Sequence, residues 1–223
     1  MRTAFADWVS GSEFSCLGAR SAVRREVWDF GVFGDLDDRS TTGAMHGALE
    51  EFIKNRVSLS QNFVTFVAAF RGPLDISEEK FEELLWTRLS WLREYERDRY
   101  AWAPDVDSDP GSEHFAFSIA EQSMFVVGMH AQASRISRRF PYPAIAFNPH
   151  SQFRQLRERN MYSGLQRQIR KRELRLQKSL NPNLAEHGEQ SEARQYSGRA
   201  ATAEWRCPVP GVFAEKRTPR EDD

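Results

Sequence analysis

The sequence predicts an α+β protein, with a mostly antiparallel sheet of about five strands flanked by helices. Short β-rich runs recur along the chain, and segments with apolar residues at helical spacing lie between and after them. Of the 223 residues, 40% are hydrophobic, which is enough for one large core. We therefore expect a single domain over residues 1–214, followed by a charged and disordered tail at 215–223.

Five runs are expected to form strands, because each is rich in β-branched, aromatic or other apolar residues and is bounded by turn residues. Two of them, 114–120 and 123–130, would form a hairpin with Glu121 and Gln122 at its tip. Residues 1–24 show no clear periodicity and are expected to be irregular around a Gly-containing turn. The five expected strands are 25–34, 62–70, 114–120, 123–130 and 143–147.

Four segments carry apolar residues at the spacing of a helix, and the one at 77–99 is the clearest. Glu78 and Glu79 lie in its first turn, where negative charge favours the helix dipole. The last helix has an Arg- and Lys-rich face that we expect to be solvated. The four expected helices are 42–56, 77–99, 148–160 and 162–178, and residues 181–199 have the composition of turns.

Charge and composition exclude several classes of protein. A formal net charge of −1 argues against a dedicated nucleic-acid-binding protein, which usually has a basic excess. No run approaches the length of apolar chain that crosses a membrane, and the N-terminal residues lack the apolar core of a secretory signal. We therefore expect a cytoplasmic protein with no membrane partner. Cys16 and Cys207 form no CxxC pair, so a structural zinc site is not indicated.

The stretch Ser123–Phe140 is the most informative for function. An apolar run leads to His130, and Arg135, Arg138 and Arg139 follow it closely. A histidine at a strand end can ligate a metal, and arginines bind carboxylates by paired hydrogen bonds. Together they suggest a pocket for an iron porphyrin, with His130 as axial ligand and the arginines on its propionates. The alternative is an ordinary core histidine followed by a solvated basic turn.

Other side chains offer further candidates. Cys16 and Cys207 are alternative iron ligands, although each also fits a small core residue. Glu113 and Glu192 could accept a cationic group such as a guanidinium. The remaining histidines are expected in structural positions, with His46 half-exposed at a helix start; these are His46, His114, His150 and His187.

Four segments of the chain resemble the YqcI/YcgG family, and more closely its haem-dependent branch of guanidine N-hydroxylases. The resemblance spans about residues 14–208. In the family a His-Pro pair often follows the strand, whereas this chain has His130-Ala131. The segments are FSCLGARSA (14–22), EHFAFSIAEQSMFVVGMH (113–130), ASRISRRFPYPAIAFNPHSQFRQLR (133–157) and NPNLAEHGEQSEARQYSGR with the following WRCP (181–208).

The resemblance implies haem b and the hydroxylation of a guanidine nitrogen of L-arginine or a related compound, driven by O₂ or peroxide. It makes His130 the first choice of axial ligand. The partners implied are a small guanidino substrate and the oxidant, without nucleic acid; a homodimer is left open. Two other functions stay open: another haem task, such as peroxidase-like oxidation, nitrogen-oxide chemistry or haem sensing, and a regulatory or stress protein without a cofactor.

Overall fold

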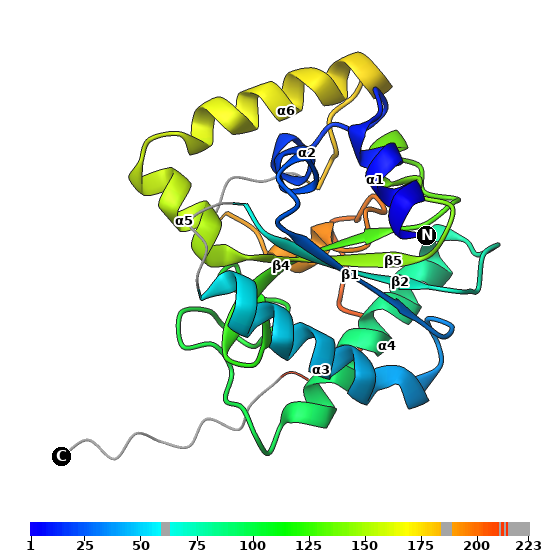
Figure 1. Ribbon diagram of the computed structural model, residues 1–223, viewed down its shortest axis with the longest axis vertical. Coiled ribbons are helices and arrows are strands. Elements are labelled where there is room, and N and C mark those ends of the chain that lie inside the picture. Colours follow the sequence, from blue (N-terminus) through cyan, green and yellow to red (C-terminus); the bar gives the residue numbers. More distant parts are fainter. Residues whose placement is uncertain (59–62, 184–188, 210, 212, 214–223) are drawn as a thin grey trace.

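The computed structural model describes residues 1–58, 63–183, 189–209, 211 and 213. A five-stranded sheet lies in the middle, with α3 and α4 on one face and α1, α2 and α6 on the other (Figure 1). The strand order is β1-β2-β5-β4-β3. The strands are β1 (Trp28–Phe33), β2 (Thr65–Phe70), β3 (Phe117–Ile119), β4 (Gln122–Met129) and β5 (Ala144–Pro149).

The sheet is mostly antiparallel, as the sequence predicts. Only β1 and β2, which are connected through α3, pair in parallel; the β2–β5, β5–β4 and β4–β3 pairs are antiparallel. All six residues of β2 are buried, which explains why this strand reads as a continuous apolar run rather than an alternating one. The α+β fold is therefore confirmed.

The expected hairpin forms, but its tip is displaced by one residue. Ala120 and Glu121 connect the strands with φ values of 45° and 60°, and Gln122 already belongs to β4. Positive φ at both central positions gives the twist that a two-residue hairpin needs. Neither residue is a glycine or asparagine, so the turn chemistry does not mark its position in the sequence.

Six α-helices are present in the described part of the chain, and the first two correct the expectation that residues 1–24 are irregular. In α1 the buried residues are Phe5 and Val9, one turn apart, and its helix ends before Gly11. Such short helices show too few apolar repeats to stand out. The helices are α1 (Arg2–Ser10), α2 (Leu17–Arg24), α3 (Thr42–Phe52), α4 (Glu78–Glu96), α5 (His150–Glu158) and α6 (Tyr162–Gln177), with shorter helical turns η1 (Arg39–Thr41), η2 (Ile53–Val57), η3 (Ile136–Arg138) and η4 (Glu192–Gln195).

Alternate residues of the strands point into two separate cores. On β4, Met124 and Val126 pack in the core beneath α3 and α4, whereas Val127 and Met129 face the core beneath α1. This follows from the two-residue period of a strand. The sheet therefore separates two environments, and a shift of one residue along β4 moves a side chain from one to the other.

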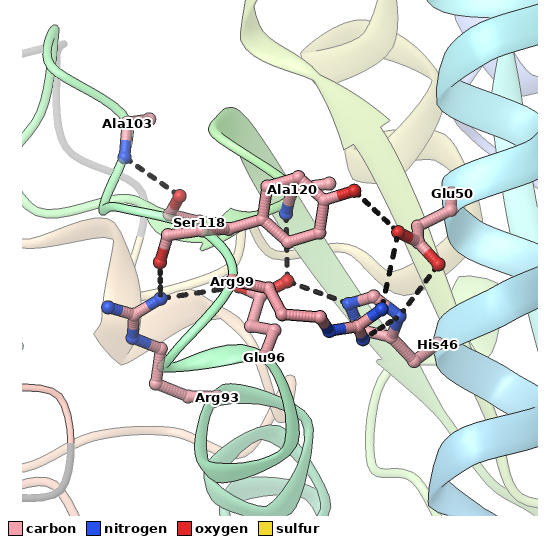
Figure 2. A network of polar contacts seen from close by, with 9 residues as sticks. His46, Glu50, Arg93, Glu96, Arg99, Ala103, Ser118 and Ala120 are labelled. Atoms are coloured by element: carbon pink, nitrogen blue, oxygen red, sulfur yellow. Dashed lines mark hydrogen bonds and ion pairs between the residues drawn. The ribbon is translucent and has the colours of Figure 1, made fainter.

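A buried polar network joins α3, α4 and the β3–β4 turn (Figure 2). His46 contacts two carboxylates, with its Nε2 2.8 Å from Glu96 and its Nδ1 3.2 Å from Glu50. The Glu96 carboxylate also accepts the backbone N–H of Ala120 at 2.9 Å, and the Glu50 carboxylate accepts the hydroxyl of Tyr100 at 2.6 Å. That bond and the nearby charge of His46 hold the pKa of Glu50 below its usual value.

The segment around η4 is fastened to the sheet at Gly128. The backbone N–H of Gly128 donates to the carbonyl of Tyr196 at 2.7 Å. A Cβ on Gly128 would lie 2.6 Å from both Leu85 and Phe81 and 2.9 Å from that carbonyl. Only glycine permits such a close approach. The segment around η4 therefore lies directly against β4 at Gly128.

Candidate functional site

Two neighbouring cavities lie beside α6; one extends to the sheet, α1 and α2, and the other extends to α5 and the segment before β3. Their volumes are about 260 Å³ and 210 Å³, and we call them the larger and the smaller cavity. The smaller cavity has a floor of alternate strand residues that includes Val67, Val127 and Ala146. Both cavities are lined by Phe125, Ile169, Glu173 and Gln195, so these side chains form the boundary between them.

The smaller cavity contains a thiol and a guanidinium. Cys16 lies at the start of α2; burial raises the pKa of its thiol, and the nearby charge of Arg138 opposes that rise. Arg138 donates hydrogen bonds to the carbonyls of Gly128 at 2.8 Å, Tyr196 at 3.2 Å and Gln195 at 3.2 Å. Burial lowers the pKa of Arg138 to about 10. Because carbonyls carry no formal charge, the positive charge of this arginine is still available to an anion.

The larger cavity contains a histidine held by a carboxylate. The Nε2 atom of His150 is 3.0 Å from Glu192, and both side chains are largely buried. The Tyr196 hydroxyl donates to the same carboxylate at 2.6 Å and accepts the backbone N–H of Phe117 at 3.0 Å. Burial, together with the adjacent charge of Glu192, raises the pKa of Tyr196 well above its usual value. These bonds hold Glu192 in one place and leave it facing the cavity.

The structure brings most of the predicted site residues to these cavities. Glu113 and Glu192, the expected guanidinium acceptors, both line the larger cavity. Arg135 and Arg138, two of the expected anion-binding arginines, both line the smaller one. Arg135 is buried and paired with Glu173, and it also donates to Ser179 at 3.0 Å. The acidic candidates thus line one cavity and the basic candidates line the other, and the two cavities share a wall.

Two predicted residues lie elsewhere. Arg139 donates to the backbone carbonyls of Ala133 at 2.7 Å and Ser134 at 3.2 Å, so it stabilises its own turn. Cys207 lines a separate, more open cavity of about 820 Å³ beside Trp205. Burial raises the pKa of the Cys207 thiol to about 12, so it is protonated at neutral pH. Neither residue is among the described residues that line the two cavities.

His130 follows β4 on the α4 side of the sheet, opposite the cavities. Its ring stacks on Phe81 with centroids 4.3 Å apart, and its exposed fraction is 1%. Within the described residues, neither of its ring nitrogens has a hydrogen-bond partner. Burial lowers the pKa of His130, with an opposing effect of Glu78. His130 is not among the described residues that line either cavity, so its role as an iron ligand stays a prediction from the sequence.

Sequence reasoning missed the position of His150. It was expected only to begin a helix, and it does begin α5, but it also lines the larger cavity next to Glu192. The two residues are 42 positions apart, and no spacing in the sequence reveals the contact. Tyr196 donates its hydroxyl to Glu192 within the same segment. His187 lies outside the described residues.

A metal ion held only by protein side chains is not indicated among the described residues. Among the described residues, no group of three or more His, Cys, Asp and Glu side chains is placed to hold a metal ion. An iron held in a porphyrin needs only one or two protein ligands, so this finding does not bear on haem. None of the described helices is both long and apolar enough to cross a membrane.

The fold is that of an α+β protein, and two adjoining cavities lie beside its helix α6. The model described as "YqcI/YcgG family" matches residues 5–210, so the chain belongs to that family. It is also 24% identical over 195 residues to the uncharacterized protein YqcI of Bacillus subtilis (strain 168), covering 83% of this chain and 75% of that protein. No solved structure matches the chain.

Proposed function

We propose that this protein is a haem-dependent monooxygenase that hydroxylates a guanidine nitrogen of L-arginine or a related guanidino compound. One observation carries the proposal: carboxylates that suit a guanidinium and arginines that suit propionates line two adjoining cavities. Membership of the YqcI/YcgG family supports it, because the sequence resembles the haem-dependent branch of that family.

The residues of the cavities fit haem b. A porphyrin is flat and apolar with two anionic side groups, and the smaller cavity offers a floor of small apolar strand residues with Arg138 at hand. Two side chains suit an iron ligand: Cys16 lines the smaller cavity, and His150 lines the larger cavity that adjoins it. We favour His150, because Glu192 holds its ring as carboxylates commonly hold metal-ligating histidines. Bound haem would supply the activation of oxygen.

The carboxylates have the task of placing the substrate. Glu113 and Glu192 line the larger cavity, and a carboxylate binds a guanidinium through two parallel hydrogen bonds. Tyr196 keeps Glu192 in position through its 2.6 Å bond. With O₂, a guanidine N–H, two electrons and two protons yield N–OH and water; with hydrogen peroxide, no added electrons are needed. Holding the guanidinium in one orientation selects which nitrogen reacts.

The test is the absorption spectrum of the purified protein after haem addition, before and after reduction under carbon monoxide. We expect a Soret band with a histidine-type carbonyl form. His150→Ala should lose most of the bound haem, whereas His130→Ala should keep it, since that ring lies on the other face of the sheet. A thiolate-type carbonyl spectrum would transfer the ligand role to Cys16, to be checked with Cys16→Ser.

Other outcomes would contradict the proposal. Loss of haem from His130→Ala but not from His150→Ala would restore the ligand predicted from the sequence. Conversion of arginine to its N-hydroxy product would be assayed by mass spectrometry with reductant or peroxide. A Soret band without this conversion would favour a different haem-dependent function. Absence of a Soret band even with added haem would favour a regulatory protein without a cofactor.

A further inference from the structure

The outer face of α6 combines positive charge with exposed apolar surface. Arg167, Lys171, Leu174, Arg175 and Lys178 are all exposed, and we call this set the basic face. Their spacing places Arg167, Lys171, Leu174 and Arg175 on one side of α6, and Lys178 follows at the C-terminal cap of the helix. Leu174, in the last turn of α6, has an exposed fraction of 45%.

No negative charge offsets this face within the helix. The acidic residue of α6 is Glu173, which is buried on the opposite side and paired with Arg135. The whole chain has a formal net charge of −1, so the positive charge is local to this region and is balanced elsewhere. A local field of this kind attracts a partner of opposite charge and orients it.

The inner side of the same helix lines the cavities. Leu165 and Gln166 line the larger one, and Ile169 and Glu173 line both. An α-helix with its side chains is about 10–12 Å across, so a protein bound to the basic face would lie one helix away from the cavities. Figure 1 shows α6 running along the outside of the molecule, above the face of the sheet that α2 also covers.

We propose that the basic face of α6 is the docking surface for an acidic electron-transfer protein, of the ferredoxin or flavodoxin class. This rests on the proposed function. Hydroxylation with O₂ consumes two electrons, so two molecules of a one-electron carrier are oxidised for each N–OH and each water formed. Small, charge-guided interfaces suit carriers that must bind and leave in each cycle, and Leu174 adds a central apolar contact.

A nucleic acid is the less suitable occupant of this surface. Proteins that bind single strands place aromatic rings among their cations, so that bases can stack. The exposed residues of α6 and its C-terminal cap are instead Ser163, Gly164, Arg167, Gln168, Lys171, Leu174, Arg175 and Lys178. Such a face offers charge without a stacking platform.

The experiment titrates the ¹⁵N-labelled protein with a plant-type [2Fe–2S] ferredoxin and follows the amide signals at low and high salt. We expect shifts along α6 and affinity that falls steeply with salt. The variant Arg167→Glu/Lys171→Glu/Arg175→Glu should weaken binding about tenfold or more. A matched control, Lys54→Glu/Lys80→Glu/Arg97→Glu, makes the same charge change at exposed positions outside α6 and should retain most of the affinity.

The outcomes separate this proposal from the proposed function. Shifts confined to α6 and abolished by the α6 variant support the docking surface, whether or not the protein shows a Soret band. Absence of binding, equal weakening by both variants, or tighter binding of a single-stranded oligonucleotide to the same face would overturn it. With haem bound, the rate of iron reduction by ferredoxin should fall in the α6 variant and not in the control.

Discussion

His46 and His130 are both buried on the α4 side of the sheet, yet their surroundings are opposite. His46 lies between two carboxylates and has an exposed fraction of 0%, although a half-exposed position was expected from the sequence. His130 stacks on Phe81 with both ring nitrogens unpartnered among the described residues. Burial alone therefore says little about a histidine, since its partners decide whether it stabilises the fold or costs free energy.

The largest effect is expected from breaking the His46 network. His46→Leu removes the side chain whose Nε2 lies 2.8 Å from the buried carboxylate of Glu96, and we expect the free energy of unfolding to fall by about 3 kcal/mol. Urea denaturation measures it. Arg39→Ala is the control, because it removes an exposed ion pair with Glu94 and should cost less than about 1 kcal/mol. Equal losses in both variants would show that the network contributes no more than a surface pair.

Replacing His130 is expected to change the free energy of unfolding by less, and in the opposite direction. His130→Leu replaces two unpaired buried nitrogens with apolar atoms of similar size, so stability at pH 8 should rise by about 1 kcal/mol. His114→Leu, at an exposed histidine, should change stability by less than about 0.5 kcal/mol. A loss at His130 beyond about 1 kcal/mol would mean that its ring has a partner in solution, and haem is the first to examine.

The smallest expected effect is a pH dependence of stability that arises from His130. The folded pKa of His130 is lowered from 6.5, so below about pH 6.5 the unfolded chain takes up a proton that the folded chain resists. The protein should therefore lose stability as pH falls from 7 to 5.5. The stability gain of His130→Leu should grow over that range. Unfolding curves at both pH values measure it, and a constant gain would contradict the lowered pKa.

Local patterns were enough to predict most of the fold. The α4 stripe, the fully buried β2 and the β3–β4 hairpin each carry their signal within a short window. The helices of residues 1–24 did not, because two short helices show only one or two turns of apolar spacing. The tip of the hairpin shifted by one residue because its positive φ values fall on residues that do not favour them.

The candidate site was harder to predict because it depends on contacts between distant segments. Glu192 contacts His150 across 42 residues, and four of the five strands lie between Cys16 and Arg138, which line the same cavity. The sequence indicated the acidic and basic residue types correctly, and several reach the cavities. The sequence did not show which face of the sheet the side chain of His130 occupies. In the structure, the alternation of side chains along β4 places its ring on the α4 side.

The contact of Gly128 with Tyr196 also sets the order in which the site is completed during synthesis. Every strand and α-helix precedes η4 in the chain, so a nascent chain can begin to assemble its sheet while Glu192 and Gln195 are still to be made. These two residues form part of the cavity walls. A ribosome-bound chain therefore has an incomplete pocket until this last segment emerges and docks on Gly128. Completion of the cavity walls is consequently a late event, which follows translation of the sheet.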